Sequence, residues 1–193
     1  MLRKIRSLVS NSDYFGIYDN ALSKKECNIL IKEFEKYSPD LGQTSMGYCP
    51  EAKKCLQLDL DFDDGSVISN ILFSVCVKYL DQYIKSYQCL KEIHYWKIYN
   101  EYSFQKYETE DDGYKNWHCE HCMGEPYSLR VLAWMFYLND AKCGTEFMNY
   151  PTGSAKMGRL VIWPAGWTHL HKGVTPNRGL KYITTGWCSF YDK

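Results

Sequence analysis

The spacing of apolar residues changes near residue 90, and this change constrains the fold more than any other feature of the chain. Before it, apolar residues recur with a helical period at about 23–37 and 67–87. Beyond it, short runs rich in Tyr, Ile, Val, Thr, Trp and Phe alternate with turns rich in Gly, Pro, Asn and Asp. The first pattern is typical of amphipathic helices and the second of strands. Helices followed by short strands predict a β-sandwich or jelly roll with helices on one face.

Each predicted helix has a recognisable start. Ser23 and Glu26 form a capping box, in which the serine oxygen bonds the third backbone N–H and the glutamate reaches back to the serine N–H. Pro39 ends this helix. The polar segment 61–66 supplies the N-cap of the second helix. We therefore predict two helices that bury one apolar face each.

The strand-like runs fill the rest of the chain. They lie at about 93–99, 102–108, 129–138, 145–150, 159–163, 170–175 and 180–190. The length fits a single domain, 1–193, with helical support over about 1–90 and a jelly-roll core over about 91–193.

The charge and composition limit the classes of binding partner and the cellular compartment that we expect. The 193 residues include 23 basic and 23 acidic side chains, so the net charge is zero, which argues against a nucleic acid or a membrane held by bulk electrostatics. No apolar run approaches the roughly 20 residues of a membrane helix, and the basic start of the chain lacks the apolar core of a signal peptide. The nine cysteines are irregularly spaced, as in proteins with reduced thiols. We expect a cytoplasmic protein.

Four of the five histidines lie in two clusters, WHCEHC at 117–122 and WTHLH at 167–171. His118 and Glu120 are two positions apart, so at a strand end their side chains point to the same side and can bind one metal. We expect His169 and His171 to alternate to the same strand face, so that either would complete a 2-His-1-carboxylate facial triad. That triad leaves positions open on Fe(II) for a bidentate co-substrate and dioxygen.

The segment from His171 to Trp187, HKGVTPNRGLKYITTGW, resembles the C-terminal signature of prolyl-4-hydroxylase-type 2-oxoglutarate/Fe(II) dioxygenases. In that family the distal iron histidine is followed by a glycine, a proline turn and, ten residues on, a basic residue. Lys181 is ten residues from His171, and Trp187 is six residues beyond Lys181. This spacing, with Gly173, favours His171 over His169 as the ligand.

Lys181 also indicates an anionic ligand on physical grounds. It shares one strand face with Ile183 and Thr185, and a lysine on an inward apolar face needs a counter-charge because an unpaired buried ammonium is costly. By the resemblance, the C5 carboxylate of 2-oxoglutarate supplies it.

Further segments match the family in order and spacing. They are FQKY at 104–107, RVLAWMFYLN at 130–139, TEF at 145–147 and GRLVIWP at 158–164. The chain departs from the family at Glu120, where aspartate is usual although other branches of the superfamily use H-x-E. It also has Lys142 and Cys143 where a double glycine is usual.

The resemblance implies a double-stranded β-helix enzyme that hydroxylates an unactivated C–H, with succinate and CO2 as co-products. Its cofactor is Fe(II), its co-substrates are 2-oxoglutarate and O2, and ascorbate is a further reductant. The expected partner is a protein or peptide, hydroxylated at a prolyl residue. The implied metal ligands are His118, Glu120 and His171. The implied 2-oxoglutarate residues are Lys181, Tyr137, Tyr107 and Thr145. Arg130 and Trp187 are the implied substrate residues.

Other functions stay open at the level of sequence. Within the superfamily the substrate could be a free amino acid, another small molecule or a methylated nucleobase; the last is disfavoured because that branch typically has arginine at the position of Lys181. Outside enzymes, Cys119 and Cys122 with two histidines could hold structural zinc in a binding module. The chain could also be a non-catalytic scaffold, which Glu120 leaves open.

Overall fold

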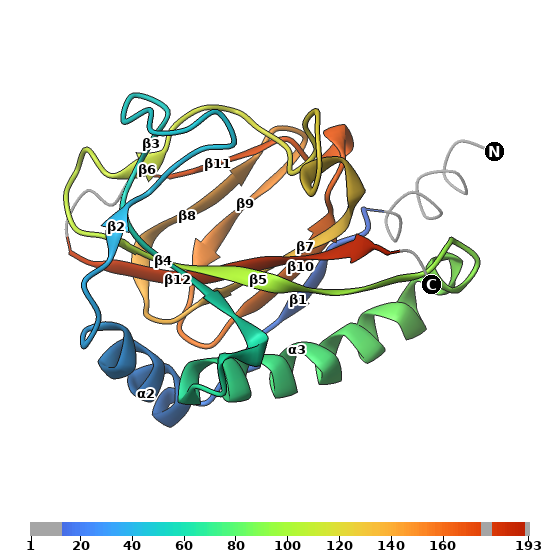
Figure 1. Cartoon of the computed structure of the whole chain (residues 1–193), viewed down its shortest axis with the longest axis horizontal. Coiled ribbons are helices and arrows are strands. Elements are labelled where there is room, and N and C mark those ends of the chain that lie inside the picture. Colours follow the sequence, from blue (N-terminus) through green and yellow to red (C-terminus); the bar gives the residue numbers. More distant parts are fainter. Residues whose placement is uncertain (1–12, 175–178, 192–193) are drawn as a thin grey trace.

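The computed structural model describes residues 13–174 and 179–191 and shows a two-sheet jelly roll backed by two helices (Figure 1). The main sheet has seven antiparallel strands, in the order β1 (Gly16–Tyr18), β10 (Leu160–Pro164), β7 (Arg130–Tyr137), β12 (Lys181–Phe190), β5 (Trp96–Tyr107), β4 (Leu56–Asp61) and β2 (Asp40–Leu41). The second sheet is β11 (His171–Gly173), β8 (Ala141–Phe147) and β9 (Tyr150–Ala155). A small ribbon pairs β3 (Lys53–Lys54) with β6 (Gly113–Tyr114). The predicted mainly-β fold with supporting helices is confirmed.

The two helices lie on the outer face of the main sheet (Figure 1). α2 (Lys24–Phe34) begins with the predicted capping box: the Ser23 Oγ accepts from the Glu26 N–H, and the Glu26 carboxylate accepts from the Ser23 N–H. α3 (Val67–Ser86) is capped by Ser66, as the polar segment before it predicted. Short 3-10 turns connect other elements: η1 (Phe62–Asp64), η2 (Gln88–Lys91), η3 (Tyr127–Leu129) and η4 (Trp167–His169). No helix of the described residues is long and apolar enough to cross a membrane.

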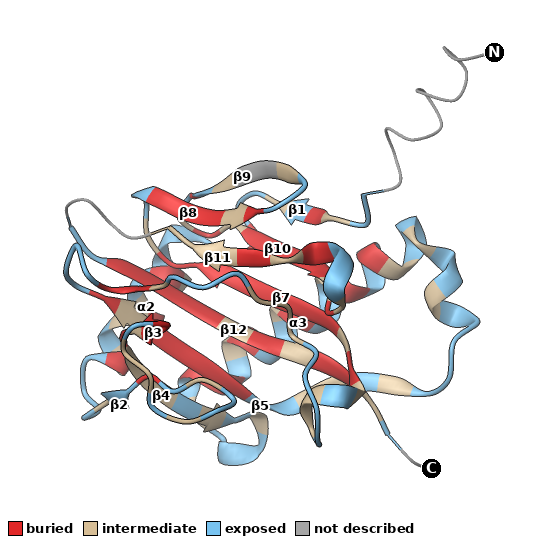
Figure 2. Cartoon of the chain, turned by 90° about the horizontal axis from the view of Figure 1, so that it is seen from above, coloured by how far each residue is buried: buried red, intermediate tan, exposed pale blue. Residues whose placement is uncertain are grey.

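β7 explains why the sheet has two apolar faces. Its residues are buried almost throughout, and they alternate between two clusters. Leu132, Trp134 and Phe136 pack against the helices, whereas Ala133, Met135 and Tyr137 face the second sheet. A strand covered on both sides reads as a continuous apolar run, as this one does. Figure 2 shows the same burial along β7, β12 and β5.

Two strand predictions need correction. The runs at 93–99 and 102–108 belong to one strand, β5, because the chain stays extended through the polar residues between them. The predicted break is nevertheless a real irregularity: Gly186 pairs with Tyr102 and Cys188 with Ile98, so β5 bulges between these pairs. The run at 145–150 is divided between β8 and β9, which are separate strands of one hairpin.

The first ninety residues contribute more than helices. β1, β2 and β4 extend the main sheet, and β3 belongs to the small ribbon. We did not predict these strands from the sequence. β1, β2 and β3 are only two or three residues long, whereas the LQLDLD alternation of β4 is a strand pattern that our prediction overlooked.

Candidate active site

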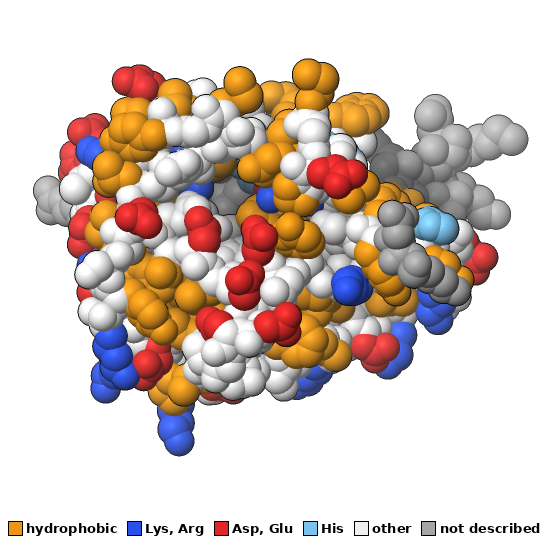
Figure 3. Space-filling view, in the orientation of Figure 1, with side chains coloured by type: hydrophobic (Ala, Val, Ile, Leu, Met, Phe, Trp, Pro, Cys, Tyr) orange, Lys and Arg blue, Asp and Glu red, His pale blue; other side chains and the backbone are white. Residues whose placement is uncertain are grey.

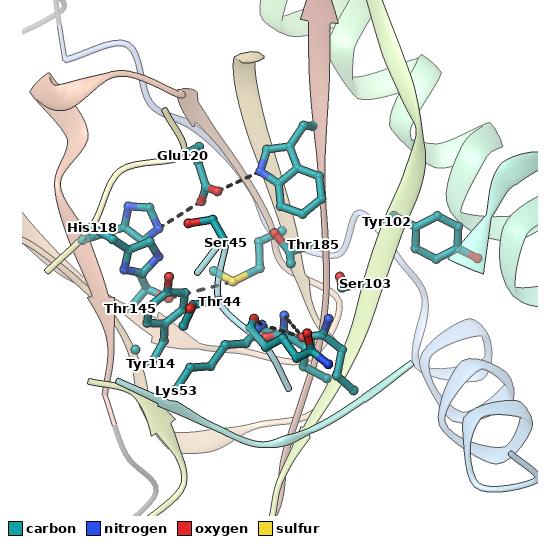
Figure 4. Close-up of a pocket in the computed structure, with 18 of the residues that line it drawn as sticks. Thr44, Ser45, Lys53, Tyr102, Ser103, Tyr114, His118, Glu120, Thr145 and Thr185 are labelled. Carbon is teal, nitrogen blue, oxygen red and sulfur yellow. Dashed lines mark hydrogen bonds and ion pairs between the residues drawn. The ribbon is translucent and has the colours of Figure 1, made fainter. Parts of the chain in front are cut away.

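A cavity of about 740 Å³ opens between the inner face of the main sheet, the second sheet and the β3–β6 ribbon (Figure 4). The structure brings all nine predicted site residues into its lining: His118, Glu120 and His171; Lys181, Tyr137, Tyr107 and Thr145; Arg130 and Trp187. Most come from inward-facing positions of β5, β7, β8 and β12. The period of two along these strands separates cavity residues from helix-facing core residues. Arg130 is the exception, because the register between β7 and β12 shifts between Leu132 and Arg130.

The two histidine clusters meet through the backbone. His118 and His171 form an isolated antiparallel bridge, in which each N–H donates to the carbonyl of the other at 3.0 and 2.9 Å. Glu120 is held next to them because its N–H donates to the carbonyl of Ala165 at 3.0 Å. The ligand atoms of His118, Glu120 and His171 all lie within 4.8 Å of one another. Within the described ranges, no other group of three His, Cys, Asp or Glu side chains is gathered in this way.

The hydrogen bonds of the two imidazoles fit a metal site. The Nδ1 of His118 lies 2.9 Å from the carbonyl of Asn116, and the Nδ1 of His171 lies 2.9 Å from the carbonyl of His169. Because a carbonyl can only accept, each Nδ1 carries the proton and each Nε2 keeps its lone pair. The Nε2 of His171 then faces the Glu120 Oε1 at 3.2 Å. Two electron-rich atoms at this distance call for a cation between them, and two imidazoles with one carboxylate are the donor set that Fe(II) takes.

Burial and charge keep His118 and Glu120 in their ligating forms. Burial, with the neighbouring His171, lowers the pKa of His118 to about 4, so this imidazole is neutral at neutral pH. Burial opposes the negative charge of Glu120, but the adjacent His171 imidazole and the Arg130 guanidinium outweigh this effect. The pKa of Glu120 is therefore held well below its usual range.

Arg130 and Trp187 hold the far oxygen of Glu120. The Trp187 Nε1 donates to the Glu120 Oε2 at 2.8 Å, and the Arg130 guanidinium lies 3.4 Å from the same oxygen. The guanidinium also stacks on the Trp187 ring at 3.5 Å from its centroid. Both residues line the cavity, where we predicted contacts with substrate; in this structure their polar atoms contact the carboxylate instead. Substrate contact by Arg130 and Trp187 stays a prediction.

Lys181 lies at another part of the cavity and is 2% exposed. Its Nζ donates to the carbonyl of Val174 at 3.1 Å and lies 4.3 Å from the centroid of the Tyr107 ring. It forms no ion pair with any carboxylate of residues 13–174 and 179–191. Burial lowers the pKa of this ammonium, so an anionic ligand would be needed to stabilise its charge.

The hydroxyl groups near Lys181 are held in place by neighbours. The Tyr137 hydroxyl donates to the Thr145 Oγ1 at 2.7 Å, and the Tyr107 hydroxyl donates to the Gln105 Oε1 at 2.6 Å. A carboxylate beside Lys181 would lie next to the Tyr107 ring, and the Thr145 hydroxyl and the two phenols line the same cavity. The arrangement suits the C5 carboxylate of 2-oxoglutarate, although the individual roles stay predictions.

His169 does not lie on the same face as His171. It closes the 3-10 turn η4, and its buried ring points away from the cavity, with Nε2 2.8 Å from the carbonyl of Asp13. Our prediction that the two histidines alternate to one face was wrong, because the chain turns between them instead of running as a strand. His169 still serves the site, since its carbonyl fixes the Nδ1 of His171.

Cys119 and Cys122 form no metal group with the histidines. Both line the cavity, and their thiols contact the carbonyls of His121 and Met123. The His121 Nε2 hydrogen bonds to the carbonyl of Arg130. The zinc module considered above therefore has no four-ligand site among the described residues.

Comparison with known proteins finds a family match over part of the chain. Residues 102–189 match the family model of the 2OG-Fe(II) oxygenase superfamily. The chain carries a 2OG-Fe(II) oxygenase domain. The oxygenase is accordingly a dioxygenase that uses Fe(II), 2-oxoglutarate and O2, as the His-Glu-His group and the sequence resemblance predicted. No curated protein matches the sequence of the whole chain.

Solved structures share the double-stranded β-helix fold at low identity. The viral collagen prolyl hydroxylase of Paramecium Bursaria Chlorella virus-1, in its 2OG complex, is 17% identical with a TM-score of 0.69 over 93% of this chain and 98% of that chain. A Trichoplax adhaerens prolyl hydroxylase in complex with a hypoxia inducible factor peptide is 16% identical, with a TM-score of 0.71 over 97% and 91%. A Pseudomonas putida prolyl-4-hydroxylase is 14% identical, with a TM-score of 0.68 over 100% of both chains.

One buried residue of the cavity was not predicted from the sequence. Lys53, on β3, is 5% exposed and lines the cavity beside Tyr114. A pair of adjacent lysines is typical of an exposed turn, so nothing in the sequence indicates that the first of the two is buried. Only the pairing of β3 with β6 turns it inward.

Proposed function

We propose that the oxygenase hydroxylates a prolyl residue of a peptide or protein. The observation that carries this proposal is one cavity that contains both a His-Glu-His group and a buried lysine, Lys181, that forms no ion pair with a carboxylate of the described residues. The similarity to prolyl hydroxylases, one of them bound to a peptide, supports the choice of proline. Bound Fe(II) and 2-oxoglutarate would supply the activation of O2 that an unactivated C–H requires, with succinate and CO2 as co-products.

The residues that line the cavity would have different roles, according to where they lie. His118, Glu120 and His171 would hold Fe(II), each with a lone pair or charge already directed to one point. Lys181 and Thr145 would hold the far carboxylate of 2-oxoglutarate, with Tyr137 and Tyr107 beside them. The walls of the cavity would exclude water from the reacting centre.

The acidic surface beside the cavity supports a peptide over a nucleic acid. Figure 3 shows acidic side chains gathered over β4 and β5, where Asp59, Asp61 and Glu101 are exposed. A phosphate backbone would be repelled by this surface. We further propose that the protein acts in the cytoplasm, which its nine free cysteines support.

Turnover of 2-oxoglutarate tests the proposed function. The protein is titrated anaerobically with Fe(II) and 2-oxoglutarate, and succinate is then measured in air with proline-rich peptides and with matched peptides in which alanine replaces proline. We expect peptide-stimulated succinate release and a mass gain of one oxygen on the proline peptides only. Succinate release stimulated instead by free amino acids would assign a small-molecule substrate. Tightly bound zinc without 2-oxoglutarate binding would contradict the enzyme.

Trp187 is expected to position the metal ligand Glu120. Replacing Trp187 with phenylalanine keeps the ring under Arg130 but removes the N–H that bonds the Glu120 Oε2. Loss of such a contact to a metal-binding carboxylate typically weakens metal affinity by about 10–100-fold. Anaerobic titration with Fe(II) or Mn(II) measures the change, and a thermal melt without metal checks the fold. Trp167→Phe, at a residue 78% exposed, is the control. Equal metal affinity in Trp187→Phe and wild type would show that the hydrogen bond does not position Glu120.

A further inference from the structure

Lys53 is a second buried cation in the cavity, and its surroundings differ from those of Lys181. Its Nζ donates to the carbonyl of Gln43 at 2.9 Å and to the Gln57 Oε1 at 2.5 Å. It forms no ion pair with a carboxylate anywhere in the described part of the chain. The adjacent Lys54 points the other way, is 43% exposed and pairs with Asp112 at 3.7 Å.

The nearest acidic side chain is kept from Lys53 by an amide. The Gln57 Oε1 accepts from Lys53, while the Gln57 Nε2 donates to Asp59 at 2.8 Å. Asp59 is therefore on the far side of Gln57 and also accepts from the Ser103 hydroxyl at 2.5 Å. The ammonium is desolvated without a direct counter-charge, and burial lowers its pKa. Such a group gains most from an anion that enters the cavity.

The Tyr114 ring lies between Lys53 and the metal ligand His118. Its Nζ is 5.7 Å from the centroid of the Tyr114 ring, and that ring stacks on His118 with centroids 3.6 Å apart. Figure 4 shows Lys53 and Glu120 on opposite sides of the cavity. An anionic group beside Lys53 would thus be part of a molecule whose neighbouring atoms reach the metal site.

None of the ion pairs and ligand contacts assigned above involves Lys53. Arg130 pairs with Glu120. Under the proposed function, one carboxylate of 2-oxoglutarate binds the metal and the other binds Lys181. The further anion must therefore come from the molecule that is oxidised, and the acidic surface over β4 and β5 disfavours one that carries many negative charges (Figure 3).

We propose that Lys53 binds a carboxylate of the substrate, close to the residue that is hydroxylated. This inference rests on the proposed function and makes it more specific: the preferred substrate carries one carboxylate near its target C–H. That carboxylate could be an acidic side chain next to the target in a peptide, or the free α-carboxylate of the target residue itself.

Matched acid and amide probes test the proposal by binding. The probes are capped proline peptides that differ only by glutamate or glutamine before or after the proline, and N-acetyl-L-proline with N-acetyl-L-prolinamide. Each is titrated calorimetrically into protein loaded with Mn(II) and 2-oxoglutarate. We expect wild-type protein to bind at least one acid about tenfold or more tightly than its amide, as for a charge-assisted hydrogen bond. The pair that shows the preference identifies the source of the carboxylate.

Variants locate the preference at Lys53. Lys53→Met should abolish the discrimination between acid and amide while leaving the affinity for 2-oxoglutarate unchanged, and Lys53→Arg should restore part of it. Lys54→Met is the matched control and should behave as wild type. Thermal melts show that each variant is folded.

Three results would overturn the inference. The first is that wild-type protein binds acid and amide equally, or binds neither measurably. The second is that Lys53→Met keeps the full preference for the acid. The third is that Lys53→Met loses 2-oxoglutarate binding, which would make Lys53 a co-substrate residue. The proposed function is tested separately from the Lys53 site. If no proline peptide stimulates succinate release, the proposed function is wrong. A Lys53-dependent preference for the acid would still support the carboxylate site in that case.

Discussion

Replacing His171 with alanine is expected to abolish Fe(II)-dependent turnover of 2-oxoglutarate. The substitution removes an imidazole whose Nε2 faces Glu120 and whose tautomer is fixed by the carbonyl of His169. The two remaining protein groups, His118 and Glu120, would bind a divalent metal too weakly to retain it at micromolar concentrations. Anaerobic Fe(II) titration and succinate release measure the loss, and His118→Ala should have the same effect.

His169→Ala is the matched control for this prediction. His169 is in the same short segment and is buried, but its ring contacts Asp13 and Tyr150 outside the cavity, and its carbonyl survives the substitution. We expect the variant to melt at a lower temperature and to keep its affinity for Fe(II). An inactive His169→Ala beside an active His171→Ala would show that the ligand assignment is wrong.

Lys181→Met is expected to fold nearly normally and to lose 2-oxoglutarate. Because the Nζ of Lys181 pairs with no carboxylate of the described residues, removal of the charge is expected to cost little stability, whereas breaking a buried ion pair would cost about 3–5 kcal/mol. The lost charge-assisted bond should weaken 2-oxoglutarate binding by about 1.5–3 kcal/mol, which is more than tenfold. The measurement is titration of the Mn(II) protein with 2-oxoglutarate, beside a thermal melt without ligand.

Lys106, on the neighbouring strand β5, is the matched control, because it is a lysine with protein carboxylates as partners. It pairs with Glu35 at 3.0 Å and Glu108 at 2.8 Å, so its charge is already neutralised by the protein. Lys106→Met should leave the affinity for 2-oxoglutarate unchanged. A Lys181→Met protein that melts far below wild type and binds 2-oxoglutarate normally would remove the main support for the co-substrate site.

Patterns that repeat along the chain determined the fold class. The capping box at Ser23, the helical stripe over 67–86 and the alternation in β12 are local, and each was predicted correctly because the backbone period itself decides which face is buried. The nine site residues could be named because several motifs, above all the ten-residue spacing from His171 to Lys181, match those of a known family.

The contacts between distant segments were decided by the tertiary structure alone. No pattern indicates that Arg130 and Trp187 meet on the same oxygen of Glu120, because three separate segments contribute these side chains and their order in the sequence does not fix their distance. Lys53 is the extreme case: it belongs to a pair of adjacent lysines, and it is buried because a two-residue strand pairs with β6 in the ribbon that borders the cavity. The sequence by itself therefore determined which residues face inward along regular strands. The packing of the sheets and the ribbon around one cavity decided which of these residues contact one another. It also decided which lysines have no carboxylate partner among the described residues.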